Sequence, residues 1–97
     1  MVTHIVLWNY VDSLTQEQKK EAGEKIKKEL EQLCGVIPGV LSIEVQLNEL
    51  PSSTRDLALF VKCESVEALN EYAVHPEHLK VVEYIKTVTC NRTAFDY

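Results

Sequence analysis

Much of what the sequence says about the fold starts from the stretch Glu71-Tyr72-Ala73-Val74-His75-Pro76-Glu77-His78, where a phenol and two imidazoles surround a proline. Proline disfavours the helical conformation in the residue before it, so His75 is expected to end one helix. Pro76 suits the first turn of a second helix, where its missing N–H is not needed. His78 then lies one turn into that helix, with its side chain directed back over the preceding turn. The stretch therefore predicts two helices joined at His75.

The residues around this joint predict four strands and a further helix. Thr15-x-x-Gln18 has the capping-box pattern that opens a helix, Gly35 is a plausible C-terminal cap, and Ser65 is a favourable N-cap for the helix before the joint. Periodicity and β-forming residues predict strands at residues 2–11, 40–47, 57–63 and 91–97. The order is β-α-β-β-α-β, with the second helical segment broken in two. This order predicts a single α+β domain over residues 1–97, with a ferredoxin-like fold and a four-stranded antiparallel sheet.

The first strand is apolar on both faces, which has a consequence for assembly. Val6 and Trp8 alternate with Ile5 and Leu7, so each face of the strand needs a cover. Two helical segments cover only one face of a four-stranded sheet. We expect a second copy of the chain to cover the open face, which gives a homodimer with the architecture of a dimeric α/β barrel. A charge at Val6 is expected to disrupt that dimer.

The composition excludes several classes of partner. The chain has 97 residues and a net charge of −5, without a basic stripe that could neutralise phosphates, so nucleic acid is not an expected partner. No apolar run approaches membrane-spanning length, and the N-terminus lacks the basic start of a signal peptide. We therefore expect a cytoplasmic protein that does not bind membranes.

Neither a metal nor a cofactor is expected. Cys34, Cys63 and Cys90 form no CxxC pair and have apolar neighbours, which predicts reduced core residues. His75 and His78 are three residues apart, but no third ligand stands beside them. The chain also has no Gly-rich phosphate loop and no nucleophile elbow.

Over nearly its whole length, the sequence resembles the Dabb family of stress-responsive dimeric α/β-barrel proteins. The resemblance rests on His4-Ile5-Val6-Leu7, Pro38-Gly39-Val40, Asp56-Leu57-Ala58-Leu59, Ser65-x-x-Ala68-Leu69-x-x-Tyr72-x-x-His75-Pro76-x-His78 and Phe95-Asp96-Tyr97. One departure is Cys63, where the family more often has an aromatic residue. The resemblance implies the ferredoxin-like fold and homodimerisation, whereas most members of the family have no assigned reaction.

One plant branch of this family is similar to polyketide cyclases of the olivetolic acid type, which close a poly-β-keto thioester by aldol chemistry. In that branch a tyrosine and a histidine at the positions of Tyr72 and His78 serve the reaction, and an aspartate at the position of Asp96 orients the histidine. All three residue types are present here. The resemblance also implies that His4 lines the same cavity.

These residues suit the chemistry, and each also has a structural explanation. A histidine titrates near neutral pH and can act as a base, a carboxylate on its other nitrogen fixes its tautomer, and a tyrosine can donate to an enolate oxygen. Alternatively, a hydrogen bond between His78 and Asp96 ties the last helix to the last strand. His75 is either a cap at the helix joint or a ligand-binding residue, and His4 either packs or lines a ligand cavity.

Two functions from different classes remain open. The first is a homodimeric Dabb protein of unassigned activity that binds a small apolar molecule between sheet and helices. The second is a cofactor-free enzyme of the cyclase or lyase type that uses His78, Tyr72 and Asp96. A fold does not by itself decide between them.

Overall fold

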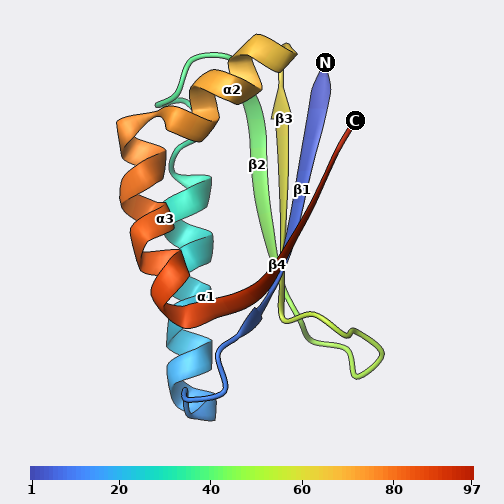
Figure 1. The fold of residues 1–97 in the computed structure, drawn as a ribbon, viewed down its shortest axis with the longest axis vertical. Coiled ribbons are helices and arrows are strands. Elements are labelled where there is room, and N and C mark those ends of the chain that lie inside the picture. The colour runs from blue at the N-terminus through green and yellow to red at the C-terminus, as the bar shows by residue number, and fades with distance from the viewer.

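The computed structural model describes all residues from 1 to 97 and has the expected ferredoxin-like fold (Figure 1). The elements are β1 (Val2–Tyr10), α1 (Gln16–Glu31), β2 (Val40–Leu47), β3 (Leu57–Cys63), α2 (Val66–Val74), α3 (Pro76–Val88) and β4 (Thr89–Asp96). The strands form one sheet in the order β2-β3-β1-β4, and all neighbours are antiparallel. The three helices lie on one side of the sheet, as Figure 1 shows. None of the helices combines the length and the apolar content needed to span a bilayer.

Local capping explains where the helices begin and end. The Thr15 hydroxyl accepts from the Gln18 N–H and the Gln18 side chain accepts from the Thr15 N–H, which confirms the predicted capping box. Ser65 caps α2, and His75 separates α2 from α3 in an extended conformation, as its position before proline requires. The first helix ends earlier than expected, at Glu31, and Gly35 lies in the turns that follow it.

The core lies between the helices and one face of the sheet. Val6 is 1% exposed and Trp8 is 5% exposed, and both pack under the helices with Leu57 and Leu59 of β3. The expectation that Val6 lies on the open face is therefore wrong. Because both faces of β1 are apolar, the alternation of the strand gave no sign of which face the helices cover.

The open face of the sheet, on the side away from the helices, carries the residues that alternate with these core residues along the strands. Ile5 is paired with Phe60 on one side and with Phe95 on the other, and Leu7 is paired with Ala58. Phe95 is 66% exposed, although it is a large apolar side chain. A single chain thus leaves a contiguous apolar surface on the side of the sheet away from the helices.

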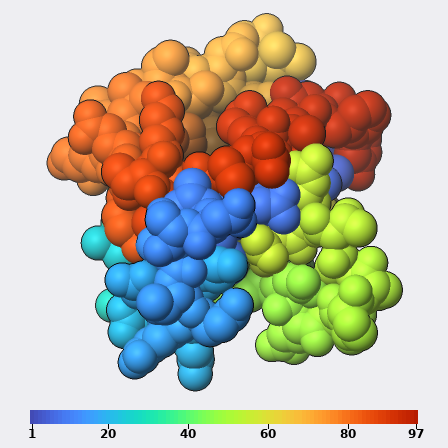
Figure 2. Space-filling view, turned by 60° about the horizontal axis from the view of Figure 1, so that its bottom comes forward, coloured from blue at the N-terminus to red at the C-terminus, as the bar shows by residue number.

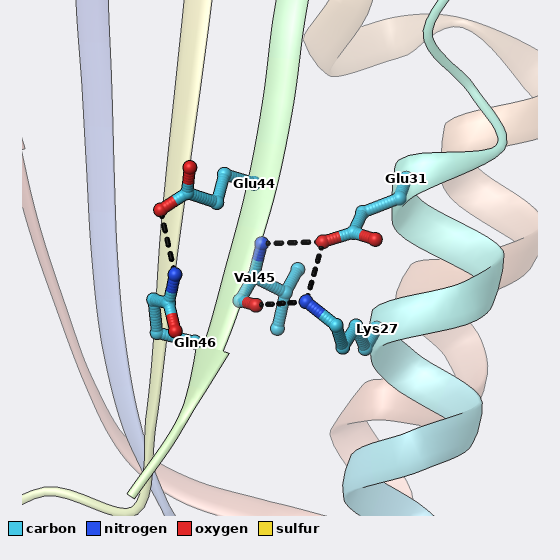
Figure 3. Close-up of polar contacts among 5 residues, drawn as sticks. All are labelled: Lys27, Glu31, Glu44, Val45 and Gln46. Carbon is cyan, nitrogen blue, oxygen red and sulfur yellow. Dashed lines mark hydrogen bonds and ion pairs between the residues drawn. The ribbon is translucent and has the colours of Figure 1, made fainter.

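The outer edge of β2 is held by side chains of α1 (Figure 3). Glu31 accepts from the Val45 N–H at 3.0 Å, Lys27 donates to the Val45 carbonyl at 2.7 Å, and the two side chains pair with each other at 2.8 Å. Burial raises the pKa of the Glu31 carboxyl, but the hydrogen bonds from Lys27 and Val45 outweigh it and leave the pKa lowered. The two side chains occupy the backbone groups that an added strand would need.

A few side chains lie elsewhere than expected. Cys63 is buried as predicted, but Cys34 is exposed and Cys90 is half-buried, so the prediction of three core thiols is wrong for Cys34. In α2 the buried residues are Ala68 and Tyr72, whereas Val66 at its start is 56% exposed.

Candidate functional site

A cavity of about 560 Å³ lies between the sheet and the last two helices. Its apolar wall includes Val6 and Trp8 of β1, Leu59 of β3, and Val82 and Ile85 of α3. Its polar lining includes His4, Tyr72, His78, Lys86, Arg92 and Asp96. The residues of β4 (red) meet those of α3 (orange) along one flank of the molecule in Figure 2. The cavity therefore lies where the C-terminal strand and the Tyr72–His78 joint come together.

His78 lies one turn into α3, as its position after Pro76 predicts. Its Nδ1 is 3.2 Å from the carbonyl oxygen of Ala73, at the end of α2. Because a carbonyl oxygen only accepts, this nitrogen carries the hydrogen, and Nε2 is the basic atom of the neutral ring. Burial lowers the pKa of His78, and the charges of His4, Arg92 and His75 act in the same direction, against the opposing effect of the Ala73 hydrogen bond. His78 is thus predominantly neutral at pH 7.

Tyr72 packs against His78, and its hydroxyl group has no partner. The two ring centroids are 4.2 Å apart with an angle of 38° between the planes. The tyrosine is 1% exposed, and no hydrogen bond reaches its hydroxyl oxygen. Burial raises the pKa of Tyr72, and the neighbouring Cys63 thiol adds to this effect. The phenol therefore remains protonated, and a buried donor without an acceptor is uncommon in folded proteins.

Asp96 pairs with His4, and the predicted hydrogen bond between His78 and Asp96 does not form. The carboxylate accepts from His4 Nδ1, and the two residues face each other directly across β1 and β4. The pairing leaves His4 Nε2 as the basic atom of its neutral ring. The expectation failed because it depended on the register of β4 against β1, which periodicity does not reveal.

His75 lies outside the group of residues that line the cavity. Its Nδ1 accepts from the Glu77 N–H at 3.1 Å and caps α3. This contact matches the capping alternative for His75. The chain has no group of three or more His, Cys, Asp and Glu side chains placed to hold a metal ion.

The cavity lining also includes two cationic side chains that were not among the residues predicted from the sequence. Lys86 is on α3 and Arg92 is on β4, and neither forms an ion pair with a carboxylate. The signal for Arg92 lies in the sequence, because Arg92 alternates with Ala94 and Asp96 along the last strand and so shares the face of Asp96. Beside it Asn91 has a φ of 56°, in the left-handed region, where the pairing of β4 with β1 has a bulge.

Comparison with solved structures finds the same fold in proteins of several organisms. A dimeric protein of unknown function with a ferredoxin-like fold from Bacteroides fragilis is 31% identical, with a TM-score of 0.93 over 99% of this chain and 93% of that one. A Dabb family protein from Mesorhizobium loti is 15% identical, with a TM-score of 0.76 over 99% and 93% of the two chains. A hydroxynitrile lyase from Passiflora edulis is 17% identical, with a TM-score of 0.80 over 99% and 90%. The last two likenesses concern the fold alone.

The sequence was also compared with curated proteins and with family profiles. No curated protein matches it. The profile of the Dabb family, described as the stress responsive A/B barrel domain, matches residues 2–97, which is nearly the whole chain. The protein therefore belongs to the Dabb family.

Proposed function

We propose that this protein is a homodimeric Dabb-domain protein whose cavity binds a small, largely apolar molecule. The observation that carries the proposal is the cavity itself, of about 560 Å³, with apolar walls and two histidines among its lining residues. Ligand sites in proteins commonly have volumes of about 300–1,000 Å³ and combine apolar walls with a few polar groups that fix orientation. Here His4 and His78 supply those polar groups. Tyr72 lines the cavity with its ring, whereas its unpaired hydroxyl is buried away from the cavity surface.

The proposed dimer would cover the open face of the sheet. Ile5, Leu7, Phe60 and Phe95 form an apolar surface there that identical chains could share around a twofold axis. The relative from Bacteroides fragilis is described as dimeric. A contact of ordinary size would bury about 800 Å² on each partner. We also propose a cytoplasmic location, which the three unpaired cysteines support.

Sedimentation velocity tests the dimer. Phe60→Glu should give a monomer, because the new charge would be buried in the interface. Leu50→Glu is the matched control, since Leu50 is 65% exposed in the loop between β2 and β3. An unmodified chain that sediments as a stable monomer would contradict the dimer.

Binding to the cavity can be followed by the fluorescence of Trp8, the only tryptophan and a wall residue. The probes are 4-phenyl-2-butanone and 1-octanol, which are small, mainly apolar and carry one oxygen atom. Val82→Phe should abolish saturable binding, because the larger ring occupies the cavity. Val36→Phe makes the same change at a residue that is 55% exposed and does not line the cavity, and it should bind normally. Equal binding by both variants would reject the cavity as the site.

A second candidate function, a cofactor-free enzyme of the cyclase or lyase type, is favoured by the two histidines. Both His4 and His78 have Nδ1 held by an oxygen acceptor, which leaves Nε2 free to take a proton. We propose that one of these atoms removes a proton from the carbon beside a carbonyl group. The C–H electron pair then forms the C=C bond of the enolate, and the π pair of the carbonyl group moves to its oxygen. Asp96 would stabilise the imidazolium of His4, and Tyr72 would donate to the enolate only after its ring turns, because its hydroxyl is buried away from the cavity surface. The protein from Passiflora edulis with this fold is named a hydroxynitrile lyase, which is compatible with chemistry in such a cavity.

Exchange of the α-protons of 4-phenyl-2-butanone in D₂O, measured by NMR, tests this second function. A general base contributes roughly 10²-fold or more to such a step. His78→Asn or His4→Asn should therefore slow the exchange by about that factor. His75→Asn is the control, because asparagine can still cap α3 and the residue lies outside the cavity lining. Exchange at the same rate in all three variants would leave a binding protein without this chemistry.

A further inference from the structure

We propose that the ligand is a carboxylate whose charged head binds Arg92 and whose apolar body lies between α3 and the sheet. This inference rests on the proposed binding function and adds the chemical class of the ligand. Its starting observation is the charge around the cavity. The chain as a whole has a net charge of −5, but the cavity lining has two permanent cations and only one carboxylate.

That single carboxylate does not neutralise the cations. Asp96 is engaged by His4, from the opposite strand. Arg92 and Lys86 form no ion pair, in contrast to Lys25, Lys27 and Lys80 on the helices, each of which pairs with a glutamate. In an acidic protein, two unpaired cations at the edge of an apolar cavity create a local site for an anion.

Alternation along β4 turns Arg92 towards this cavity. Ala94 is paired with Val6 and Asp96 with His4, both on the face that the helices cover, and Arg92 precedes Ala94 in the same series. A bulge lies beside Arg92: Leu7 is paired with Thr93 and Asn9 with Cys90, so β4 has one more residue than β1 in this interval. Asn91 is left-handed there, and the Arg55 guanidinium, from the loop between β2 and β3, donates to the Asn91 carbonyl. Bulges of this kind are frequent beside binding sites.

The chemistry of the site favours a carboxylate over a phosphate. A guanidinium offers two parallel N–H groups that match the two oxygens of a carboxylate. A phosphate would bring a second negative charge into a lining that already holds the carboxylate of Asp96. His78 lies within the electrostatic influence of Arg92, so a carboxylate bound there should raise the pKa of His78 from its lowered value.

Calorimetric titration with three probes of the same chain length tests the inference: octanoate, 1-octanol and octyl phosphate. The unmodified protein should bind octanoate about tenfold more tightly than 1-octanol, a difference typical of one hydrogen bond to a charged group. Arg92→Gln should remove this preference and leave the affinity for 1-octanol unchanged. Arg92→Lys should retain part of it. Lys28→Gln, which removes the same charge from an exposed position on α1, should retain all of it.

The outcomes separate this inference from the function on which it rests. Equal affinity of the unmodified protein for octanoate and 1-octanol would overturn the carboxylate and leave the cavity as a binding site. Tighter binding of octyl phosphate than of octanoate would also overturn it, in favour of a phosphate. Binding of none of the probes would overturn both. The NMR titration of His78 adds an independent readout, because octanoate should raise its midpoint and 1-octanol should not.

Discussion

α1 and α3 pack against the same face of the sheet, but only the half under α1 is filled with side chains. We call this the closed half, and the half under α3, where the cavity lies, the open half. Under α1 the buried side chains Ile26 and Leu30 meet Val45 of β2, and all three are fully buried. α3 buries Val81 and Ile85, whereas β4, the edge strand on that side, has no buried residue. The difference shows that the cavity arises where large apolar side chains are missing from the sheet.

The cause can be seen in the two edge strands. β2 turns Ile43, Val45 and Leu47 towards the helices, whereas β4 turns the small Ala94 and the charged Asp96 towards them. Small and charged residues cannot fill the space below α3. The same half of the molecule carries His4, His78 and Arg92. The half with fewer large apolar side chains is thus also the half in which the ionisable side chains of the candidate site gather.

The largest expected effect is the loss of a buried side chain in the closed half. Ile26→Ala should lower the free energy of unfolding by about 3 kcal/mol, because it leaves a void that its neighbours cannot fill. Val82→Ala, at the wall of the cavity, should cost about 1 kcal/mol or less, because its side chain already borders empty space. Urea unfolding measures both. Equal losses would mean that the two halves are packed alike.

Larger side chains should also destabilise the closed half more than the open half, but by less than the loss of Ile26. Ala22 is 2% exposed under α1, so Ala22→Leu should cost about 1–3 kcal/mol through overpacking. Val82→Phe adds volume on the side of the cavity and should leave the free energy of unfolding within about 0.5 kcal/mol of its original value. The measurement is again urea unfolding, with circular dichroism to verify the fold. A marked loss from Val82→Phe would show that the cavity is not available to a larger side chain.

Much of the closed half could be predicted from the sequence, because its signals are local. The capping box at Thr15 and the apolar stripe of α1 each depend on neighbours within a few residues. The alternation of apolar and polar residues in β2, together with the order of the elements, was then enough to predict the fold. Local patterns of this kind specify which residues face inward without any knowledge of the partner strand.

The contacts in the open half depend on the register between strands that are distant in the sequence, and local sequence patterns do not predict that register. Asp96 meets His4 because residues 92 positions apart are paired across β1 and β4. The bulge at Asn91 shifts that pairing by one residue relative to the start of β4. His4 and His78 could be nominated from the sequence, but their partners could not. The site residues were thus easier to predict than the contacts that set their chemistry.

The smallest expected effect is a difference in how the two halves respond to acid. His78 in the open half has a pKa below its ordinary value of 6.5, chiefly through burial. Between that lowered pKa and 6.5 the unfolded chain binds more protons at this residue, so stability rises with pH there. The contribution of neutral His78 is therefore complete above pH 6.5 and is lost as the pH falls through the folded pKa. Unfolding of His78→Asn should not show this dependence.

Glu31 in the closed half responds in a lower range of pH. Its hydrogen bonds with Lys27 and Val45 hold its pKa below the ordinary value of 4.5. Its contribution is present above pH 4.5 and is lost as the pH falls further, through the folded pKa. Glu31→Gln should flatten the stability curve only below pH 4.5, and His78→Asn only between its lowered pKa and 6.5. If both variants changed the curve over the same range, the two halves of the molecule would not titrate independently, and the contrast between them would be one of packing alone.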